Sequence, residues 1–259
     1  MNDHVIPLSI PFLGEAERRY IQQCLDENYI SHVGPLVPRF EQEFAKLIGS
    51  QQCVSLINGT AALHLALKLA GVTSGDLVFV PALTFIAPVN AITYCGAEPF
   101  FLDTDPQTLA ISPDQLSDIL DGQCERRNDG SCIHLPTGRR IGAVVVVHLY
   151  GFAADIENLC ALCDTWDLPL IEDAAEAVGC TIAGKHLGTF GAFGCFSFNG
   201  NKALTTGGGG MLTASDSRQC EHARHLATQA KSHPELYIHD EIGYNYRMSN
   251  LHAAIGLGQ

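Results

Sequence analysis

The sequence predicts an α/β protein with a mostly parallel central sheet that is covered by helices on both faces. First, short apolar runs alternate with helical patterns over most of the 259 residues. Second, the run AVVVVH at residues 143–148 is typical of a strand buried on both faces, as strands of parallel sheets are. Third, the motifs with polar chemistry directly follow apolar runs, where open α/β sheets bind their ligands.

Seven apolar runs are candidate strands, and three amphipathic stretches between them are candidate helices. The strands are Val54–Ile57, Leu77–Val80, Pro99–Leu102, Ala143–His148, Leu168–Glu172, Gly194–Phe198 and Met211–Thr213. The helices are Thr60–Leu69, Pro113–Leu120 and Ile156–Thr165. Ser112 followed by Pro113 predicts a helix start, because serine caps a helix and proline suits its first position.

Two segments depart from this alternation. Residues 121–141 are polar and turn-rich, which predicts an excursion such as a small hairpin. This excursion is either a substrate or subunit contact or an ornamental insertion, and the sequence leaves both open. The last residues, NLHAAIGLGQ, are an apolar helical pattern without a cap, so we expect the sequence to stop inside a helix of a longer chain.

Composition and charge exclude several classes of function. A net charge of −13 without any run of Lys or Arg argues against nucleic acid as a partner. No segment approaches the roughly 18 to 20 apolar residues of a membrane span, and the start resembles no signal peptide. We therefore expect a cytoplasmic protein whose ten cysteines are reduced, the Cys160–Cys163 pair being two buried thiols. None of the eleven histidines stands at metal-ligand spacing with an acid or thiol, so we expect no metal site.

A turn between the first strand and the first helix suits a phosphate group. The run NGTAALHLAL, Asn58–Leu67, begins with a Gly-Thr turn at which several unpaired N–H groups and the positive end of the helix dipole converge. Gly59 permits close approach of the backbone, and Thr60 adds a hydroxyl group. A simple helix cap is the alternative interpretation.

An acid and a lysine follow two later strands. Asp173 ends the run LPLIED, where it is either a helix cap or a carboxylate that keeps the ring nitrogen of a cofactor protonated. Lys202 lies in CFSFNGNKALTTGGGGML with no charged residue within nine positions on either side. Such a setting favours the neutral amine that a Schiff base requires. The glycines Gly207–Gly210 allow a tight, packed turn beside a ligand.

Taken in order, the phosphate turn, the aspartate and the lysine resemble the fold type I pyridoxal-phosphate enzymes. More narrowly, the chain resembles the sugar aminotransferases of the DegT/DnrJ/EryC1/StrS family over nearly its whole length. The motifs that carry this resemblance are IPLSIPFLGEAE, SHVGPLVPRFEQEFA, PALTFIAPVNAI, GAEPFFLDTDP, VHLYG, EDAAEAVG, GTFG, SFNGNK and GYNYRMSN. The resemblance implies that residues 1–259 form the large, pyridoxal 5'-phosphate-binding domain, on which residues 1–50 pack, and that a smaller C-terminal domain is missing.

The resemblance also implies a role for each residue that matches the family's pattern. Lys202 would form the Schiff base and act as the base for the 1,3-proton shift, and Asp173 would bind the pyridine nitrogen. Glu176, where many members have Gln or His, would approach the ring hydroxyl, and Phe85 would stack on the ring. The phosphate would be held by Gly59, Thr60 and Ser197 and, from the partner subunit of a homodimer, by Asn245. Phe85 as a core residue and Asn245 as a turn residue are the alternatives.

Within the family, three segments resemble the branch that makes 4-amino sugars for legionaminic-acid-type nonulosonic acids. They are CERRNDG…TGRRI, SFNGNKALTTGGGG and QAK…YIHDEIGYNYR. The expected reaction transfers an amino group from L-glutamate to a UDP-linked 4-keto-6-deoxy-N-acetylhexosamine, with GDP-perosamine synthesis as the second candidate. A sugar dehydratase would have histidine at position 202, and a Rossmann nucleotide-binding module would need G-x-G-x-x-G where the sequence has INGTAAL. A fragment that binds the cofactor without turnover is the remaining alternative.

Overall fold

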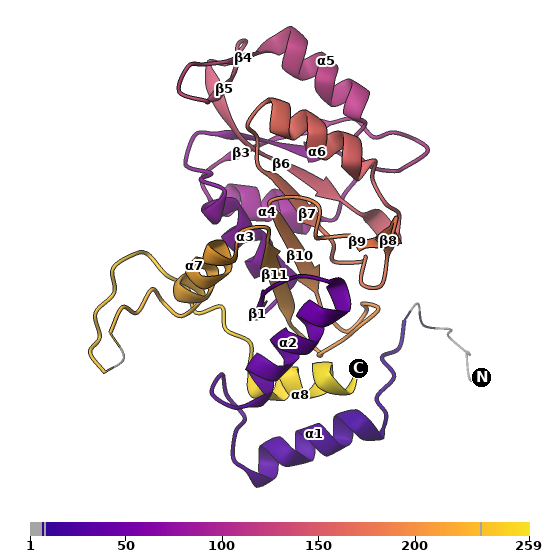
Figure 1. The fold of residues 1–259 in the computed structure, drawn as a ribbon, viewed down its shortest axis with the longest axis vertical. Coiled ribbons are helices and arrows are strands. Elements are labelled where there is room, and N and C mark those ends of the chain that lie inside the picture. Colours follow the sequence, from indigo (N-terminus) through magenta and orange to yellow (C-terminus); the bar gives the residue numbers. More distant parts are fainter. Residues whose placement is uncertain (1–6, 8, 234) are drawn as a thin grey trace, which may run out of the picture.

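The computed structural model describes residues 7, 9–233 and 235–259 as a central sheet flanked by helices (Figure 1). Residues 1–6 and 8, with which the expected N-terminal packing segment and its IPLSIPFLGEAE motif begin, lie outside the described residues. The α/β architecture with a mostly parallel sheet, predicted from the sequence, is confirmed.

Within the described residues the main sheet has nine strands, and seven of them follow the order β1-β11-β10-β7-β6-β2-β3. Strand β11 runs antiparallel to both of its neighbours, and the pairs from β10 across to β3 are all parallel. The strands of this path are β1 Cys53–Leu56, β2 Leu77–Pro81, β3 Glu98–Leu102, β6 Arg139–Val147, β7 Leu170–Asp173, β10 Phe193–Ser197 and β11 Gly210–Ala214. A separate small hairpin consists of β8 Thr181–Ile182 and β9 Lys185–His186.

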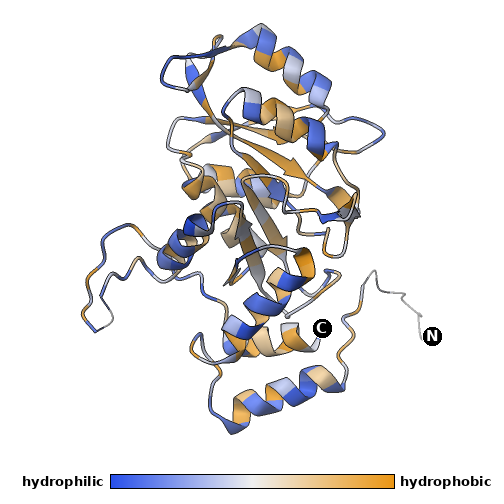
Figure 2. Ribbon diagram, viewed as in Figure 1, coloured by the Kyte–Doolittle hydropathy of each residue, from blue (hydrophilic) through white to orange (hydrophobic). Residues whose placement is uncertain are grey.

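Helices cover both faces of the sheet, because its strands are apolar on both sides. In β6, Val144 and Val146 pack in one core cluster with α2, α5, α6 and α8, while Ala143 and Val145 pack in the other with α3, α4 and α7. The helices are α1 Glu15–Asp26, α2 Leu36–Ile48, α3 Gly59–Leu69, α4 Ile86–Tyr94, α5 Pro113–Gln123, α6 Ile156–Thr165, α7 Ser217–Ala227 and α8 Asn250–Gly258. Figure 2 shows the resulting apolar strands inside a more polar helical layer.

Residues 121–141 contain the expected hairpin, which is joined to the main sheet and is not a separate excursion. Strands β4 Cys124–Arg126 and β5 Cys132–His134 pair with each other, and β5 also pairs with the first residues of β6. Strand β6 therefore begins at Arg139, four residues before the predicted start, because its polar first residues have a strand partner. The predicted cap is confirmed, since the Ser112 hydroxyl accepts a hydrogen bond from the Gln115 N–H.

The two ends of the described chain lie together. Helix α8 packs between α1 and α2 (Figure 1). The Asn250 side chain joins these segments, as its amide accepts a hydrogen bond from Leu36 N–H and donates one to the Tyr29 carbonyl. Phe40 and Phe44 of α2 continue this contact into the core by packing edge-on against Phe198. Among the described residues, no helix has the length and apolar character needed to cross a bilayer.

Candidate active site

A cavity of about 600 Å³ opens at the carboxyl ends of β1, β6, β7 and β10. This is the position at which an open α/β sheet binds ligands. Seven of the eight predicted site residues line it, which are Gly59, Thr60, Phe85, Asp173, Glu176, Ser197 and Lys202. Residues that lie up to 143 positions apart in the sequence therefore face one space, as the order of motifs predicted.

The first wall of the cavity is the N-terminus of α3. Asn58 caps this helix, its side-chain oxygen accepting a hydrogen bond from Ala61 N–H at 2.8 Å. The N–H groups of Gly59 and Thr60 belong to the first turn, where a helix offers donors that no preceding carbonyl can satisfy. A Cβ atom on Gly59 would lie 2.8 Å from Cβ of Ser197, so only glycine lets the helix approach the end of β10 this closely. The result is a cradle of N–H and hydroxyl donors suited to an anion.

The floor of the cavity carries a buried acid. Asp173 is the last residue of β7, and it lies between Val147 of β6 and Cys195 of β10 in the sheet register. Burial raises the pKa of its carboxyl group to about 6, although the N–H of Ala175 and the nearby Lys202 and His148 oppose the shift. Because burial disfavours the charged form of Asp173, a cationic partner inside the cavity would stabilise this carboxylate strongly.

Lys202 reaches the cavity from the loop between β10 and β11. Its Nζ donates a hydrogen bond to Oε1 of Glu176 at 3.0 Å, and the lysine side chain is 16% exposed. The second carboxylate oxygen of Glu176 accepts the N–H of Tyr150 at 2.8 Å. The sequence indicated an uncharged setting for this amine, because its chain neighbours carry no charge. The fold instead supplies a carboxylate from a residue 26 positions earlier.

Sequence reasoning gave no role to His148, Tyr150 or Thr84, yet all three line the cavity. His148 is wholly buried and its Nε2 is hydrogen-bonded to Oε2 of Glu172 at 2.9 Å. The hydroxyl of Thr84 is buried and has no hydrogen-bond partner within the described residues. His148 and Tyr150 directly follow the end of β6, and this position in the sequence could have indicated that they belong to the site.

Phe85 and Asn245 are both more exposed to solvent than Asp173 and Lys202. Phe85 is at the N-cap of α4 and is 71% exposed, so it is a wall of the cavity and not the core residue of the alternative interpretation. Asn245 is exposed, pairs with Thr228 in an isolated bridge, and does not line the cavity of its own chain. Its predicted contact with a partner subunit stays a prediction.

The sequence matches a known protein family over nearly its whole length. The model of the DegT/DnrJ/EryC1/StrS aminotransferase family matches residues 11–259. The chain belongs to this family. The resemblance noted from the short motifs is thereby confirmed at the level of the family, and the relation to the legionaminic-acid branch stays a prediction.

Individual proteins that are similar to this chain agree with the family assignment. The chain is 44% identical to EpsN of Bacillus subtilis (strain 168), whose name proposes a pyridoxal phosphate-dependent aminotransferase, over 98% of this chain and 63% of EpsN. It is 41% identical to the GDP-perosamine synthase of Escherichia coli O157:H7, over 98% of this chain and 65% of that enzyme. The crystal structure of the aminotransferase TlmJ from Streptoalloteichus hindustanus superposes with a TM-score of 0.86 at 33% identity, covering 97% of this chain and 64% of TlmJ. The chain thus spans somewhat less than two thirds of the length of these relatives.

Proposed function

We propose that the protein is a cytoplasmic, pyridoxal 5'-phosphate-dependent aminotransferase that moves an amino group from L-glutamate to the keto carbon of a nucleotide-linked sugar. The observation that carries this proposal is the convergence of Lys202, Asp173 and the N-terminus of α3 on one cavity. These groups match an aldehyde, a ring nitrogen and a phosphate, which are the three polar parts of the cofactor. Membership of the aminotransferase family supports the reaction type.

The residues of the cavity fit the cofactor. A volume of about 600 Å³ suits a cofactor with part of a substrate. The buried carboxyl group of Asp173, whose pKa is raised to about 6, would be stabilised by a protonated ring nitrogen. The unpartnered hydroxyl of Thr84 and the first N–H groups of α3 offer hydrogen bonds that the described residues leave unused. Each polar part of the cofactor therefore meets a group of complementary chemistry.

The chain's own residues would act on protons and on orientation. When bound, pyridoxal phosphate supplies an aldehyde that condenses with an amine and a ring that accepts electrons. Glu176 Oε1 would orient Nζ of Lys202 through their hydrogen bond, and the amine is nucleophilic only after it has lost its proton. The amine of Lys202 would then take the proton from Cα of the bound amino acid and pass it to the cofactor, as the base for the 1,3-proton shift. Asp173 holds the charge on the ring nitrogen, and Phe85 covers one side of the cavity mouth.

For the acceptor, we propose a UDP-linked 4-keto-6-deoxy-N-acetylhexosamine, used in the biosynthesis of amino sugars for cell-surface polysaccharides. Resemblance of three segments to enzymes of the legionaminic-acid branch motivates this choice. A GDP-linked 4-keto sugar is the second candidate, and the 39–41% identity to GDP-perosamine synthases of Escherichia coli and Vibrio cholerae favours it. The two candidates share the ketone and differ in the nucleotide and the N-acetyl group.

We also propose that residues 1–259 are the large domain of a longer polypeptide that works as a homodimer. Coverage of 63–65% of EpsN and the Escherichia coli enzyme supports the first part. The exposed Asn245 supports the second, since its side chain is open to a second copy. In such a dimer, Asn245 would complete the phosphate cradle of the partner subunit.

Attachment of the cofactor is tested by an absorbance spectrum of the protein with pyridoxal phosphate, followed by borohydride reduction and peptide mapping. We expect a visible band and a label on Lys202. The Lys202→Ala variant should show neither, while Lys46→Ala, which changes an exposed lysine of α2, should behave as the wild type. A label on another lysine, or none on the wild type, contradicts the proposal.

The acceptor is tested in half-reactions. Excess L-glutamate should convert the bound cofactor to its amine form, seen as loss of the visible band. A UDP-linked 4-keto-6-deoxy-N-acetylhexosamine should then restore the band. Restoration by the GDP-linked 4-keto-6-deoxyhexose alone would select the second candidate. Failure of both sugars in a protein that reacts with glutamate would refute both acceptors and leave the cofactor assignment standing.

A further inference from the structure

We propose that His225, Asp240 and Glu241 form a site for a divalent transition-metal ion of the zinc type, and that the bound ion clamps a projecting arm to α7. The arm is the segment of residues 228–233 and 235–245, which leaves the body of the molecule after α7 and returns to it (Figure 1). The site lies apart from the cavity at the carboxyl ends of the strands, and none of its three residues lines that cavity.

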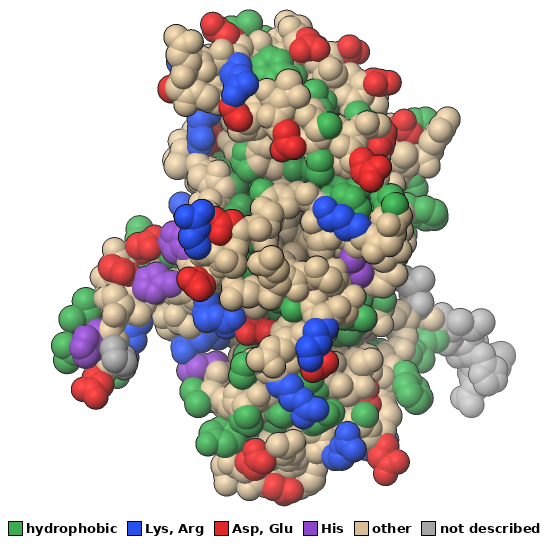
Figure 3. Space-filling view, in the orientation of Figure 1, with side chains coloured by type: hydrophobic (Ala, Val, Ile, Leu, Met, Phe, Trp, Pro, Cys, Tyr) green, Lys and Arg blue, Asp and Glu red, His purple; other side chains and the backbone are tan. Residues whose placement is uncertain are grey.

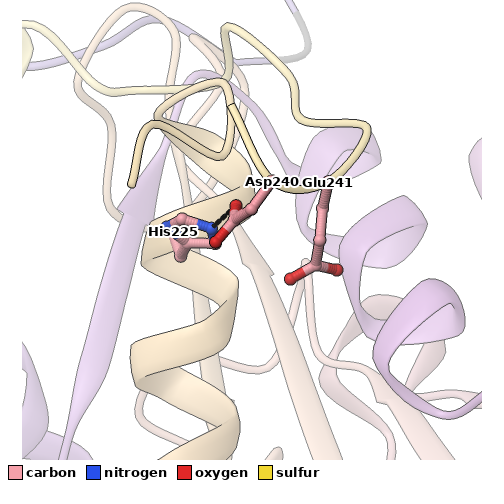
Figure 4. A group of neighbouring side chains, drawn as sticks. All are labelled: His225, Asp240 and Glu241. Carbon is pink, nitrogen blue, oxygen red and sulfur yellow. Dashed lines mark hydrogen bonds and ion pairs between the residues drawn. The ribbon is translucent and has the colours of Figure 1, made fainter. Parts of the chain in front are cut away.

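The fold brings the three side chains together from two elements. His225 lies in the last turn of α7, and the returning half of the arm carries Asp240 and Glu241. The arm pairs with itself near this point, since the N–H of Asp240 donates to the carbonyl of Ala230 and Thr228 bridges Asn245. Figure 4 shows the carboxylate of Asp240 facing the ring of His225, with the carboxylate of Glu241 beside them.

The ligand atoms are close enough for one ion. The three atoms that could bind, one from each of these side chains, all lie within 4.8 Å of one another, and Nε2 of His225 is 2.6 Å from Oδ1 of Asp240. Zinc binds histidine nitrogen and carboxylate oxygen at about 2.0–2.2 Å, so neighbouring ligand atoms of a tetrahedral site stand roughly 3.3 Å apart. Small rotations of the three side chains would bring their ligand atoms to this spacing. The ion would replace the proton in the hydrogen bond between His225 and Asp240.

A second histidine supports the carboxylate that is farther from His225. His222 lies one turn earlier on the same face of α7, and its Nε2 contacts both oxygens of Glu241 at 2.9 and 3.1 Å. A histidine that hydrogen-bonds a ligating carboxylate fixes its orientation, and such partners are common around metal ions. His222 is therefore the positioning residue of the site. Figure 3 shows histidine and acidic side chains side by side where the arm meets the body.

Charge and ligand type favour a zinc-type ion over magnesium or calcium. Asp240 and Glu241 together supply two negative charges, which balance a divalent ion. Magnesium and calcium take sets of oxygen ligands, whereas imidazole nitrogen suits zinc and its neighbours in the transition series. His225, Asp240 and Glu241 are 25%, 52% and 47% exposed, so an ion can enter and water can complete its coordination.

Spacing in the sequence does not indicate this group, because Asp240 follows His225 by fifteen residues, and the described residues from 228 to 239 belong to no helix or strand whose period could relate the two. The expectation of no metal site was based on spacing alone. Without a metal, the same residues would form two ordinary surface ion pairs, which stabilise a protein little. The experiment must therefore separate metal binding from ion pairing.

Metal binding is tested by calorimetric titration of the chelator-treated protein with zinc chloride alone. We expect one ion per chain from the site, at least tenfold weaker binding in His225→Ala and in Asp240→Asn, and a loss of 10–100-fold in His222→Ala, as for other supporting residues. The control is His32→Ala, which removes an exposed histidine far from the arm in the sequence and should keep the wild-type affinity. Equal zinc binding by wild type and His225→Ala, or no binding by the wild type, overturns the proposal.

The clamp is tested by hydrogen exchange with and without zinc. Zinc should slow amide exchange in residues 235–245 of the wild type at least tenfold and leave exchange there unchanged in Asp240→Asn. Unchanged exchange in a wild type that binds zinc would refute the clamp. Neither measurement uses pyridoxal phosphate or a sugar, so the outcome is independent of the proposed function.

Discussion

Oε1 of Glu176 lies 3.0 Å from Nζ of Lys202. The other oxygen of the same carboxylate accepts the N–H of Tyr150, which has a left-handed backbone conformation with φ of 54°. Left-handed backbone is costly for a residue with a side chain and persists where surrounding contacts hold it. Glu176 thus fixes both the amine on the β10–β11 loop and the turn after β6, and it connects two walls of the cavity.

This relationship makes the stability of the ligand-free protein depend on pH through Glu176. Burial alone would raise the pKa of Glu176, but the hydrogen bonds from Lys202 and from Tyr150 N–H outweigh it and hold that pKa below the usual 4.5. A depressed pKa in the folded state contributes stability above pH 4.5, which is lost as the pH falls through the folded-state pKa. Glu176→Gln should lower the free energy of unfolding by up to about 1 kcal/mol at pH 7, because the pair is partly exposed.

The measurement is urea unfolding at pH 7 and at pH 3.5. The difference between wild type and Glu176→Gln should shrink at the lower pH. Glu157→Gln, at an exposed position on α6, is the matched control and should change little at either pH. A difference that grows on acidification would refute the ion pair as its source.

Asp173 has the opposite dependence on pH. Burial raises its pKa to about 6 from 3.8, so the folded chain holds its proton more tightly than the unfolded chain. The contribution of Asp173 to the stability of the ligand-free protein should therefore fall as the pH rises from about 4 to about 6, and stay constant above that range. Asp173→Asn removes this penalty and should raise the free energy of unfolding at pH 7 by about 1–3 kcal/mol, since one pKa unit corresponds to roughly 1.4 kcal/mol.

Denaturant unfolding of the ligand-free chain checks this prediction, with Asp118→Asn on the exposed side of α5 as the control. The same Asp173→Asn substitution should weaken the binding of pyridoxal phosphate, because the ring nitrogen loses its carboxylate. A variant that is less stable than the wild type at pH 7 would show that the carboxylate is held by favourable contacts instead.

Substitution of glycine by alanine should have opposite effects on stability at Gly59 and at Gly122. Gly59→Ala would place a Cβ atom 2.8 Å from Cβ of Ser197, so α3 or β10 must shift, at a cost of about 1–3 kcal/mol. Gly122 lies in the last turn of α5, where an added Cβ atom would meet nothing within 4 Å, so Gly122→Ala should stabilise by up to about 1 kcal/mol. Thermal unfolding of the two variants measures both signs. Equal effects would contradict a steric role for Gly59.

Glu172 is the acceptor for several donors and has no exposed surface. Its oxygens bind Nε2 of His148 and accept hydrogen bonds from the backbone N–H groups of Gly188, Phe190 and Gly191. In Glu172→Gln an amide NH₂ replaces one acceptor, so donors would face a donor inside the core. We expect a loss of about 3–5 kcal/mol in unfolding free energy, measured by denaturation, as for other broken buried networks. A loss below 1 kcal/mol would indicate that water or a rearranged loop satisfies these donors.

The sequence predicted those parts of the fold that depend on local patterns. The helix Ile156–Thr165 has the predicted bounds, and Ser112 and Pro113 begin α5 as expected, because capping involves adjacent residues only. Strand β6 begins earlier than predicted, since pairing with β5 extends it through Arg139 and Arg140. Pairing between strands is a long-range property that apolar periodicity does not contain.

The same distinction holds for the candidate site. Asp173 and the turn at Gly59 could be predicted because each follows an apolar run and so falls at a carboxyl end of a strand. The pair of Lys202 and Glu176 could not, because the β8–β9 hairpin and strand β10 separate its members in the sequence. The network of His148 with Glu172 was missed for a similar reason. Glu172 is the neighbour of Asp173 in β7, and only the packing of residues 188–191 reveals its donors.

The placement of β1 has a consequence for the order in which the molecule is assembled. Strand β1 positions the N-terminus of α3, yet in the described part of the chain its sheet partner is β11, and Gln52 contacts Thr213 across 161 residues. Contacts of such long sequence separation close large loops and form slowly. The anion cradle at Gly59 therefore cannot be complete on a growing nascent chain until residues beyond 210 have emerged. Strand β1 and the N-terminus of α3 are synthesised early. The edge of β1 stays unpaired until β11, which follows the loop that carries Lys202, has been synthesised.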